Sequence, residues 1–447
     1  MSTNRQAETS ASPWRAPLLF AVVILLIVLE GTVSNAMFSG SWNSALSILN
    51  MGLISAVTAL GVNMIWGYGG LFNAGVVGFV ALGGLAPVLV STQPVPGAWA
   101  AGGPQLVLAL AAGLATLVIA VTAAARMKGV GRLPVVVLVL IAGYVVTRML
   151  FDPAVAAIEA NNPSKAGNIG GLGLPVLLSW PVGMVFAAIA AWGIGKVALG
   201  LRSDYLAIAT LGIGEIIVAI LKNEGWMARG VLNITGVPRP VPYELALQSN
   251  PAFVEAAARW AMDPATASAI YVKLCYAAVF VAVVLILILL SELALYSPWG
   301  RMMRAIRDNE TAAEAMGKDV TRRHLHLFII GCAVIGLSGA MMVTLDGLMA
   351  PGGYNPLRYT FLVWVLVIVG GSGNNWGAVL GAVLIWFLWI KAEVWGPAGM
   401  SLLTSPLSDG PLRQHLIESA PQMRFVAMGL VLLLVLRFAP RGLLPER

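Results

Sequence analysis

Long apolar segments recur along almost the whole chain, and they limit its possible folds more than any other feature of the sequence. Twelve can be distinguished, at approximately residues 17–37, 44–66, 73–92, 105–125, 133–151, 176–197, 205–222, 269–292, 325–345, 358–371, 375–394 and 422–437. A helix of about 20 apolar residues crosses the hydrocarbon core of a bilayer. The segments are too long for strands and do not alternate between apolar and polar residues, so a β-barrel is not expected.

The composition agrees with a chain that lies mostly in lipid. It is 59% hydrophobic and 11% charged, whereas soluble domains carry about 25% charged residues. Only helices satisfy their backbone hydrogen bonds in lipid with this pattern. We therefore predict an all-α integral membrane protein, a polytopic bundle of about 10–12 transmembrane helices. It forms a single domain over residues 1–447, with N-terminal spans at 17–151, central spans at 176–292 and C-terminal spans at 325–437.

The distribution of basic residues predicts the orientation of the bundle. Arg and Lys in short loops favour the cytoplasmic side. If the N-terminus is cytoplasmic and every segment crosses once, the basic stretches at 126–132 and 301–323 both lie inside. Both termini are then cytoplasmic. The net charge of +7 resides largely at span ends, so we expect lipid and no nucleic acid as a partner.

Two connecting segments on the opposite side are long. Residues 152–175 are rich in Pro, Gly and Asn and are expected to form a loop. Residues 223–268 include the sequence PAFVEAAARWAM, which is typical of an amphipathic helix at the membrane surface.

Catalytic and metal-binding patterns are not expected in this chain. Cys275 and Cys332 both lie within apolar segments, where they are typical packing residues. His324 and His326 are two residues apart and do not share a helix face. No GxxxxGK[ST] motif occurs. We predict that the chain is not an enzyme, has no metal site and binds no nucleotide of its own.

Glycine interrupts two apolar stretches in opposite halves of the chain, at residues 63–84 and 366–384. Interrupted helices in the two halves of a transporter often mark its solute pathway, because broken backbone within a membrane must line protein or water. Tight turns between closely packed spans are the alternative explanation. The candidate pathway residues are Asn63, Tyr68, Asn73, Thr210, Glu215, Asn374, Asn375 and Trp376.

Glu215 is the one good candidate for a carboxylate near the middle of a span, about ten residues into its segment. It is either a ligand for a solute ammonium group or a structural carboxylate bonded to Thr210 or a neighbouring helix. The four asparagines have a structural alternative as well, since they can satisfy backbone groups freed at the breaks. Tyr68 and Trp376 have the alternative of packing or interface aromatics.

A polar segment, residues 297–323, separates two of the apolar runs. Asp308 and Asn309 are good N-cap residues, Glu310 adds charge to the first turn, and Gly317 suits the position that ends a helix. We predict a two-turn helix at 309–316, which would be marginal alone and needs a partner to order it. The alternative is a solvated basic loop. The candidate contact residues are Arg304, Arg307, Asp308, Asn309, Glu310, Glu314 and Gly317.

Residues 300–328, GRMMRAIRDNETAAEAMGKDVTRRHLHLF, closely resemble the coupling loop of bacterial ATP-binding-cassette (ABC) importer permeases of the branched-chain amino-acid LivM type. The motif at 370–383, which contains Trp376, also resembles the family and is fairly specific, whereas the resemblances at 67–75, 201–217, 233–238 and 436–447 are weak alone. Two features depart from the family pattern. Residues 105–151 look like an extra hairpin, and Asn73 and Gly75 stand where relatives often have Ser and His.

The resemblance implies a permease subunit in the bacterial inner membrane that carries amino acids, by default branched-chain ones. Its implied partners are a homologous second permease, two cytoplasmic ATPases that use ATP and Mg, and a periplasmic substrate-binding protein. No cofactor is implied for this chain. A self-sufficient secondary transporter or channel is the alternative, although only Glu215 is available as a central coupling carboxylate. A scaffold or receptor subunit is a third option, which leaves the glycine breaks unexplained.

Overall fold

The chain folds almost entirely into helices in the computed structural model, which describes residues 14–35, 37–129, 131–162, 167–406 and 410–446. Within that part, ten helical stretches are long and apolar enough to cross a membrane. They contain α1 (Arg15–Thr32), α2 (Trp42–Val62), α4 (Pro96–Arg126), α5 (Arg132–Ala160), α6 (Val176–Ala198), α7 (Ser203–Asn223), α11 (Pro264–Tyr296), α14 (Val320–Asp346), α16 (Asn375–Leu403) and α18 (Met423–Phe438). The polytopic helical fold is thus confirmed.

Two further apolar helices are shorter and lie next to the glycine breaks. They are α3 (Val76–Ser91) and α15 (Leu362–Gly370). A π-helical turn, η1 (Asn63–Tyr68), continues α2 up to the first break, and a second one, η4 (Leu357–Phe361), precedes α15. With these two, each of the twelve apolar segments corresponds to helix in the structure.

Several boundaries differ from those expected. The first span ends at Thr32 rather than at residue 37. Helix α4 begins earlier than expected, at Pro96, and α16 ends later, at Leu403. Helix α5 continues to Ala160, so residues 152–160 are helical and not loop. Pro153 lies within this helix, where it removes one backbone hydrogen bond. The ion pair between Arg148 and Asp152, one turn apart, bridges this point at 3.0 Å.

Helix α14 lies at the centre of the bundle and packs on α2, α3 and α6, and α3 also packs on α6. Gly83 in α3 lies directly against the backbone of Gly336 in α14, with no space for a Cβ atom between them. Small residues at helix contacts allow backbones to approach closely in membranes, where lipid removes the hydrophobic drive for association. This close contact fixes α3, which follows the first glycine break, against α14.

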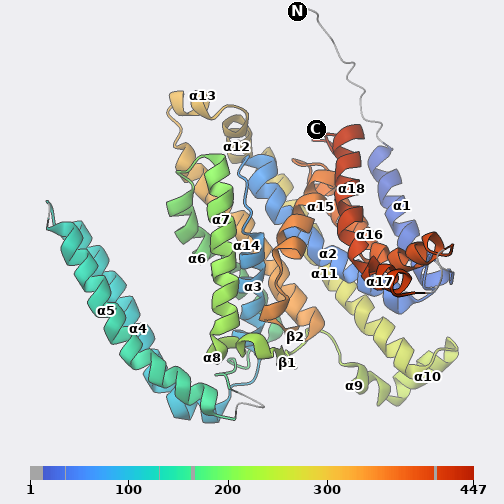
Figure 1. Ribbon diagram of the computed structural model, residues 1–447, viewed down its shortest axis with the longest axis horizontal. Coiled ribbons are helices and arrows are strands. Elements are labelled where there is room, and N and C mark those ends of the chain that lie inside the picture. Colours follow the sequence, from blue (N-terminus) through green and yellow to red (C-terminus); the bar gives the residue numbers. More distant parts are fainter. Residues whose placement is uncertain (1–13, 36, 130, 163–166, 407–409, 447) are drawn as a thin grey trace, which may run out of the picture.

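The hairpin of α4 and α5 leans away from the rest of the bundle (Figure 1). Its two helices pack mainly on each other. Its base is attached through a small apolar cluster in which Ala98, Ala154 and Ile158 meet Trp226 of α8 (Gly225–Ala228). Most large apolar side chains farther along the hairpin are exposed, as expected of a hairpin surrounded by lipid.

Short elements cover the end of the bundle that carries α8. They are η2 (Gly230–Leu232), β1 (Ile234–Thr235), α9 (Glu244–Gln248), α10 (Pro251–Arg259), β2 (Leu348–Met349) and η3 (Pro351–Gly353). Strands β1 and β2 pair antiparallel, with Ile234 opposite Met349. Helix α10 confirms the expected helix in the long connector, and the Asn250 side chain accepts a hydrogen bond from the Ala252 N–H at 3.0 Å to cap it.

The polar segment lies at the other end of the molecule. Helices α12 (Pro298–Asp308) and α13 (Glu310–Ala315) are at the same end as the start of α1 and the C-terminus of the described chain (Figure 1). The prediction for the N-terminus itself falls on residues 1–13, which lie outside the described residues.

Candidate coupling and translocation site

Helix α13 in the polar segment has the caps that its sequence predicts. The Asn309 side chain accepts a hydrogen bond from the Ala312 N–H at 3.0 Å. Gly317 adopts φ of +76°, a left-handed conformation that favours glycine. The N–H groups of Gly317 and Lys318 return to the carbonyls of Glu314 and Ala313, at 2.8 and 3.1 Å, which closes the helix. The predicted helix is confirmed, with its turns at 310–315.

Sequence reasoning missed the longer helix that precedes it. Helix α12 begins at Ser297, whose hydroxyl accepts a hydrogen bond from the Gly300 N–H at 3.3 Å, and Pro298 occupies its first turn. Met303 and Ile306 are buried against the bundle. A serine N-cap followed by proline, with apolar residues three apart, was the available signal.

Arg307, at the end of α12, connects the polar segment to the first glycine break. Its guanidinium donates a hydrogen bond to the Gly67 carbonyl oxygen. It also pairs with Glu446 near the C-terminus at 2.9 Å and with Asp308 at 3.2 Å. Burial lowers the pKa of Arg307, but the hydrogen bonds to the two carboxylates outweigh this effect and leave its pKa raised. The arginine therefore stays charged in this contact.

The other candidate residues of the segment have fewer contacts within the chain. Arg304 donates a hydrogen bond to the Leu295 carbonyl at 3.3 Å. Glu310 and Glu314 are exposed on α13. Neither makes a hydrogen bond or an ion pair with the described residues, so both are available to a partner.

The two glycine breaks, far apart in sequence, meet near this end of the bundle. Gly67 lies against Gly373, with no room for a Cβ atom. The Gly373 N–H donates to the Asn63 side-chain oxygen at 2.8 Å. Asn375 accepts hydrogen bonds from Tyr68 at 2.7 Å and from the Asn63 side-chain amide at 3.3 Å. Three of the predicted pathway residues thus form one buried polar cluster.

A glutamate that sequence reasoning did not select completes the cluster. Glu292, near the end of α11, accepts a hydrogen bond from the Asn375 side chain at 2.9 Å. Its position only four residues before the end of an apolar helix was the available signal.

Asn374 has a different role from Asn375. Its side-chain oxygen caps α16 by accepting from the Gly377 N–H at 3.1 Å, and its amide donates to the Pro445 carbonyl at 3.1 Å. The N–H groups of Leu443 and Leu444 bond to the carbonyls of α15 at 2.8 and 2.9 Å. The second break is therefore held by the C-terminal segment that ends in the Arg307 contact.

Asn73 and Thr210 lie in a separate group beside α3. The Asn73 carbonyl accepts a hydrogen bond from the Trp364 indole at 3.1 Å, and its side-chain oxygen accepts from the Gly75 N–H at 2.9 Å. The Thr210 hydroxyl accepts from the Ala74 N–H at 3.0 Å. Both side chains satisfy backbone at the break, in agreement with the structural alternative.

The last two pathway candidates are exposed. Glu215 is on the outer face of α7 and makes no hydrogen bond or ion pair with the described residues, so the expected alternative bond to Thr210 does not form. Trp376 is 44% exposed and its ring meets the edge of Phe20 at 6.0 Å between centroids. Neither belongs to the buried polar cluster.

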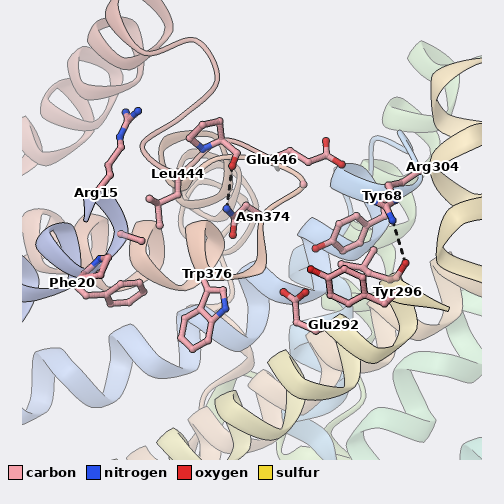
Figure 2. A pocket seen from close by; sticks show the side chains of 15 residues that line it. Arg15, Phe20, Tyr68, Glu292, Tyr296, Arg304, Asn374, Trp376, Leu444 and Glu446 are labelled. Carbon is pink, nitrogen blue, oxygen red and sulfur yellow. Dashed lines mark hydrogen bonds between the residues drawn. The ribbon is translucent and has the colours of Figure 1, made fainter. Parts of the chain in front are cut away.

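A cavity of about 520 Å³ opens beside the cluster, between α1, α11, α16 and the C-terminal segment. Figure 2 shows Glu292 between Trp376 on one side and Tyr68 and Arg304 on the other. Arg15 and Glu446 lie on its rim. The cavity thus combines charges of both signs with aromatic rings.

Comparison with known proteins agrees with this arrangement. A sequence model of the branched-chain amino acid transport system permease component matches residues 44–436. The high-affinity branched-chain amino acid transport permease proteins LivM of Salmonella typhimurium and Escherichia coli are each 26% identical over 298 residues, which is 65% of this chain and 61% of theirs. A probable LivM protein of Methanocaldococcus jannaschii is 25% identical over 66% of this chain and 73% of its own length.

The chain thus spans a little under two thirds of the length of the two bacterial relatives. No solved structure matches it significantly. Since the family match covers the glycine breaks, the polar segment and nearly all the described spans, this chain belongs to the family of permease components of branched-chain amino acid transport systems.

Proposed function

We propose that this chain is the transmembrane permease subunit of an ABC importer that passes branched-chain amino acids to the cytoplasm. The observation that carries the proposal is the link through Arg307 between the polar segment and the glycine breaks. It joins a surface suited to a partner with the part of the bundle suited to a solute pathway. The names of the relatives support the substrate class.

The proposed mechanism is alternating access, with the work supplied by other subunits. Two cytoplasmic ATPases bind ATP and Mg and hold α12 and α13 through exposed residues such as Glu310 and Glu314. Their closure moves α12, and Arg307 transmits the movement to Gly67 and, through Glu446, to the second break. The chain itself has no catalytic site and binds no cofactor.

A homologous second permease completes the pathway at the exposed face of α7. Tyr205, Ile208 and Glu215 are all exposed there. A carboxylate at the centre of a span costs about 2.5–3.5 kcal/mol when it faces lipid. We therefore propose that the second permease covers this face of α7 and that Glu215 lies beside the pathway. A periplasmic substrate-binding protein delivers the solute at the end that carries α8 to α10.

In this assembly the chain lies in the inner membrane, with α12, α13 and both termini in the cytoplasm. The orientation rests on the basic residues of the polar segment, which favour the inner side. Accessibility of a cysteine at Lys318 to a membrane-impermeant reagent tests it. Labelling from outside intact cells would overturn the proposal.

Substitutions in α13 test the coupling role. Glu310→Lys reverses a charge on the exposed surface, and Gly317→Pro removes the left-handed residue that ends the helix. Both should abolish ATP-driven uptake in cells while the protein remains inserted. Lys128→Glu, a charge reversal in the other basic loop, should transport normally. Normal uptake by both α13 variants would refute the coupling role.

Reconstitution tests the alternative of a self-sufficient transporter or channel. Purified protein in vesicles without ATPase subunits should show no uptake of leucine, with or without an ion gradient. Pull-down of an ATPase by the intact permease, lost on Glu310→Lys, would add direct support for the importer.

A further inference from the structure

The cavity between α1, α11 and α16 has no ligand assigned to it in the coupling mechanism, and its chemistry is unusual for a membrane-facing surface. Basic Arg15 and Arg304 and acidic Glu292 and Glu446 all line the same space of about 520 Å³. Within the described chain, Arg15 makes no hydrogen bond or ion pair. A ligand for this space must therefore satisfy both signs of charge.

Glu292 has acceptor capacity directed to the cavity. One of its oxygens accepts from Asn375 at 2.9 Å, and no other hydrogen bond or ion pair to this carboxylate occurs within the described residues. A carboxylate has about four acceptor sites, so most remain free. Arg304 uses one of its five donors on the Leu295 carbonyl. A ligand that carries both an ammonium group and an anionic group would satisfy the free acceptors of Glu292 and the free donors of Arg304.

The surroundings of the cavity are those of a lipid-facing groove at the membrane surface. The rings of Phe20 and Trp376 meet there edge to face, and Tyr296 is 74% exposed. Tryptophan and tyrosine are typical of the level of lipid headgroups. Arg304 of α12 lines the cavity, so the cavity lies at the end of the bundle that carries α12 and α13 (Figure 1). This end faces the cytoplasm in the proposed orientation.

An apolar stripe continues from the cavity along α11. Residues 285, 289, 292 and 296 are spaced as neighbours on one helix face. Of these, Glu292 lines the cavity, whereas Leu289 and Leu285 are 59% and 51% exposed. A ligand whose headgroup lies at Glu292 would therefore have apolar surface beneath it for an acyl chain.

We propose that this cavity binds the headgroup of phosphatidylethanolamine from the leaflet on the side of the polar segment. The primary ammonium group donates hydrogen bonds to Glu292, the phosphate lies on the side of the cavity that carries Arg304 (Figure 2), and an acyl chain follows Leu289 and Leu285. A choline headgroup has no N–H donor for the carboxylate. A glycerol headgroup has no cation for it.

Lipid titration with detection by native mass spectrometry tests the assignment on the purified full chain. Phosphatidylethanolamine should be retained in preference to phosphatidylcholine and phosphatidylglycerol with the same acyl chains. Glu292→Gln keeps an acceptor for Asn375 but removes the charge, and it should weaken phosphatidylethanolamine binding by about tenfold. Arg304→Gln keeps a donor for the Leu295 carbonyl but removes the charge beside the phosphate, so it should weaken binding as well.

Two substitutions serve as matched controls. Arg126→Gln removes an exposed basic residue at the end of α4, and Glu255→Gln removes an exposed acid from α10. Both should leave lipid binding unchanged. Thermal melting of each variant separates loss of the site from loss of the fold.

Several results would overturn the proposal. These are equal retention of phosphatidylcholine, stronger retention of phosphatidylglycerol, and unchanged binding by both Glu292→Gln and Arg304→Gln. Displacement of the lipid by free leucine would assign the cavity to the solute instead. The assay needs neither ATPase subunits nor uptake. A negative result would therefore reject the lipid site without bearing on the proposed transport function.

Discussion

At the residue scale, stability depends on a buried ion pair between Glu30 of α1 and Lys391 of α16. The exposed fractions of the two side chains are 1% and 4%. Ser39 and Ser44 donate further hydrogen bonds to the carboxylate at 2.7 and 3.0 Å. Lys391→Met leaves this carboxylate buried without its cation, which should lower the unfolding free energy by about 3–5 kcal/mol.

Thermal denaturation of the purified protein measures this loss. The double variant Glu30→Gln/Lys391→Met should recover much of the stability, because it leaves no charge unpaired. Arg259→Met breaks the exposed ion pair with Glu255, whose two side chains are 74% and 73% exposed, and should change stability little. Equal losses in Lys391→Met and Arg259→Met would contradict the argument.

In the proposed mechanism, Arg307 connects the helices that bind the ATPases to the glycine breaks of the solute pathway. Arg307→Ala removes its donor to the Gly67 carbonyl and its contact with Glu446, so ATP hydrolysis by the reconstituted complex should continue while uptake falls about tenfold. The ratio of solute transported to ATP hydrolysed measures this uncoupling. Arg301 is an exposed residue of the same helix, and among the described residues its side chain bonds only to the Tyr296 carbonyl, so Arg301→Ala should keep the ratio. An equal fall in this ratio for Arg301→Ala would show that coupling depends on the charge of α12 and not on the Arg307 contact.

At the element scale, the packing of α3 on α14 depends on two glycines. Gly83 and Gly336 touch through their backbones, so Gly83→Leu must push the helices apart. Overpacking of this kind costs about 1–3 kcal/mol or more, and the melting temperature in detergent should fall. In α6, Gly193 has open space around its Cβ position, so Gly193→Leu should be tolerated. A stable Gly83→Leu variant would disprove the close contact.

At the scale of the whole molecule, the hairpin of α4 and α5 is an appendage held at its base. Replacing residues 108–150 by a short Gly/Ser linker removes two antiparallel spans and keeps the base cluster of Ala98, Ala154 and Ile158. The remaining spans should keep their orientation, and the shortened chain should run as a single species on size-exclusion chromatography. A cysteine at Lys318 should be labelled from the same side as before. Deletion of α4 alone removes one span, so the cysteine at position 318 should then be labelled from the opposite side of the membrane. Labelling from the original side would contradict the assumed topology.

Much of this architecture follows from local sequence alone. The twelve apolar segments predicted the helices because a long apolar run has no other stable backbone arrangement in lipid. The cap residues Asn309 and Gly317 predicted α13 because their preferences act within a single turn. By contrast, α12 was missed because its apolar face is short and is interrupted by three arginines among its 11 residues.

The pairing of distant residues was decided only by tertiary structure. Glycine marked two breaks in the sequence, but packing of α2 beside α16 brought Asn63 and Tyr68 to Asn375 and added Glu292. The same packing left Glu215 and Trp376 on exposed faces, away from that cluster. Composition and periodicity determine which segments enter the membrane, since transfer into lipid depends on each segment by itself. Which polar groups then meet depends on how helices hundreds of residues apart pack, and no local preference encodes that contact.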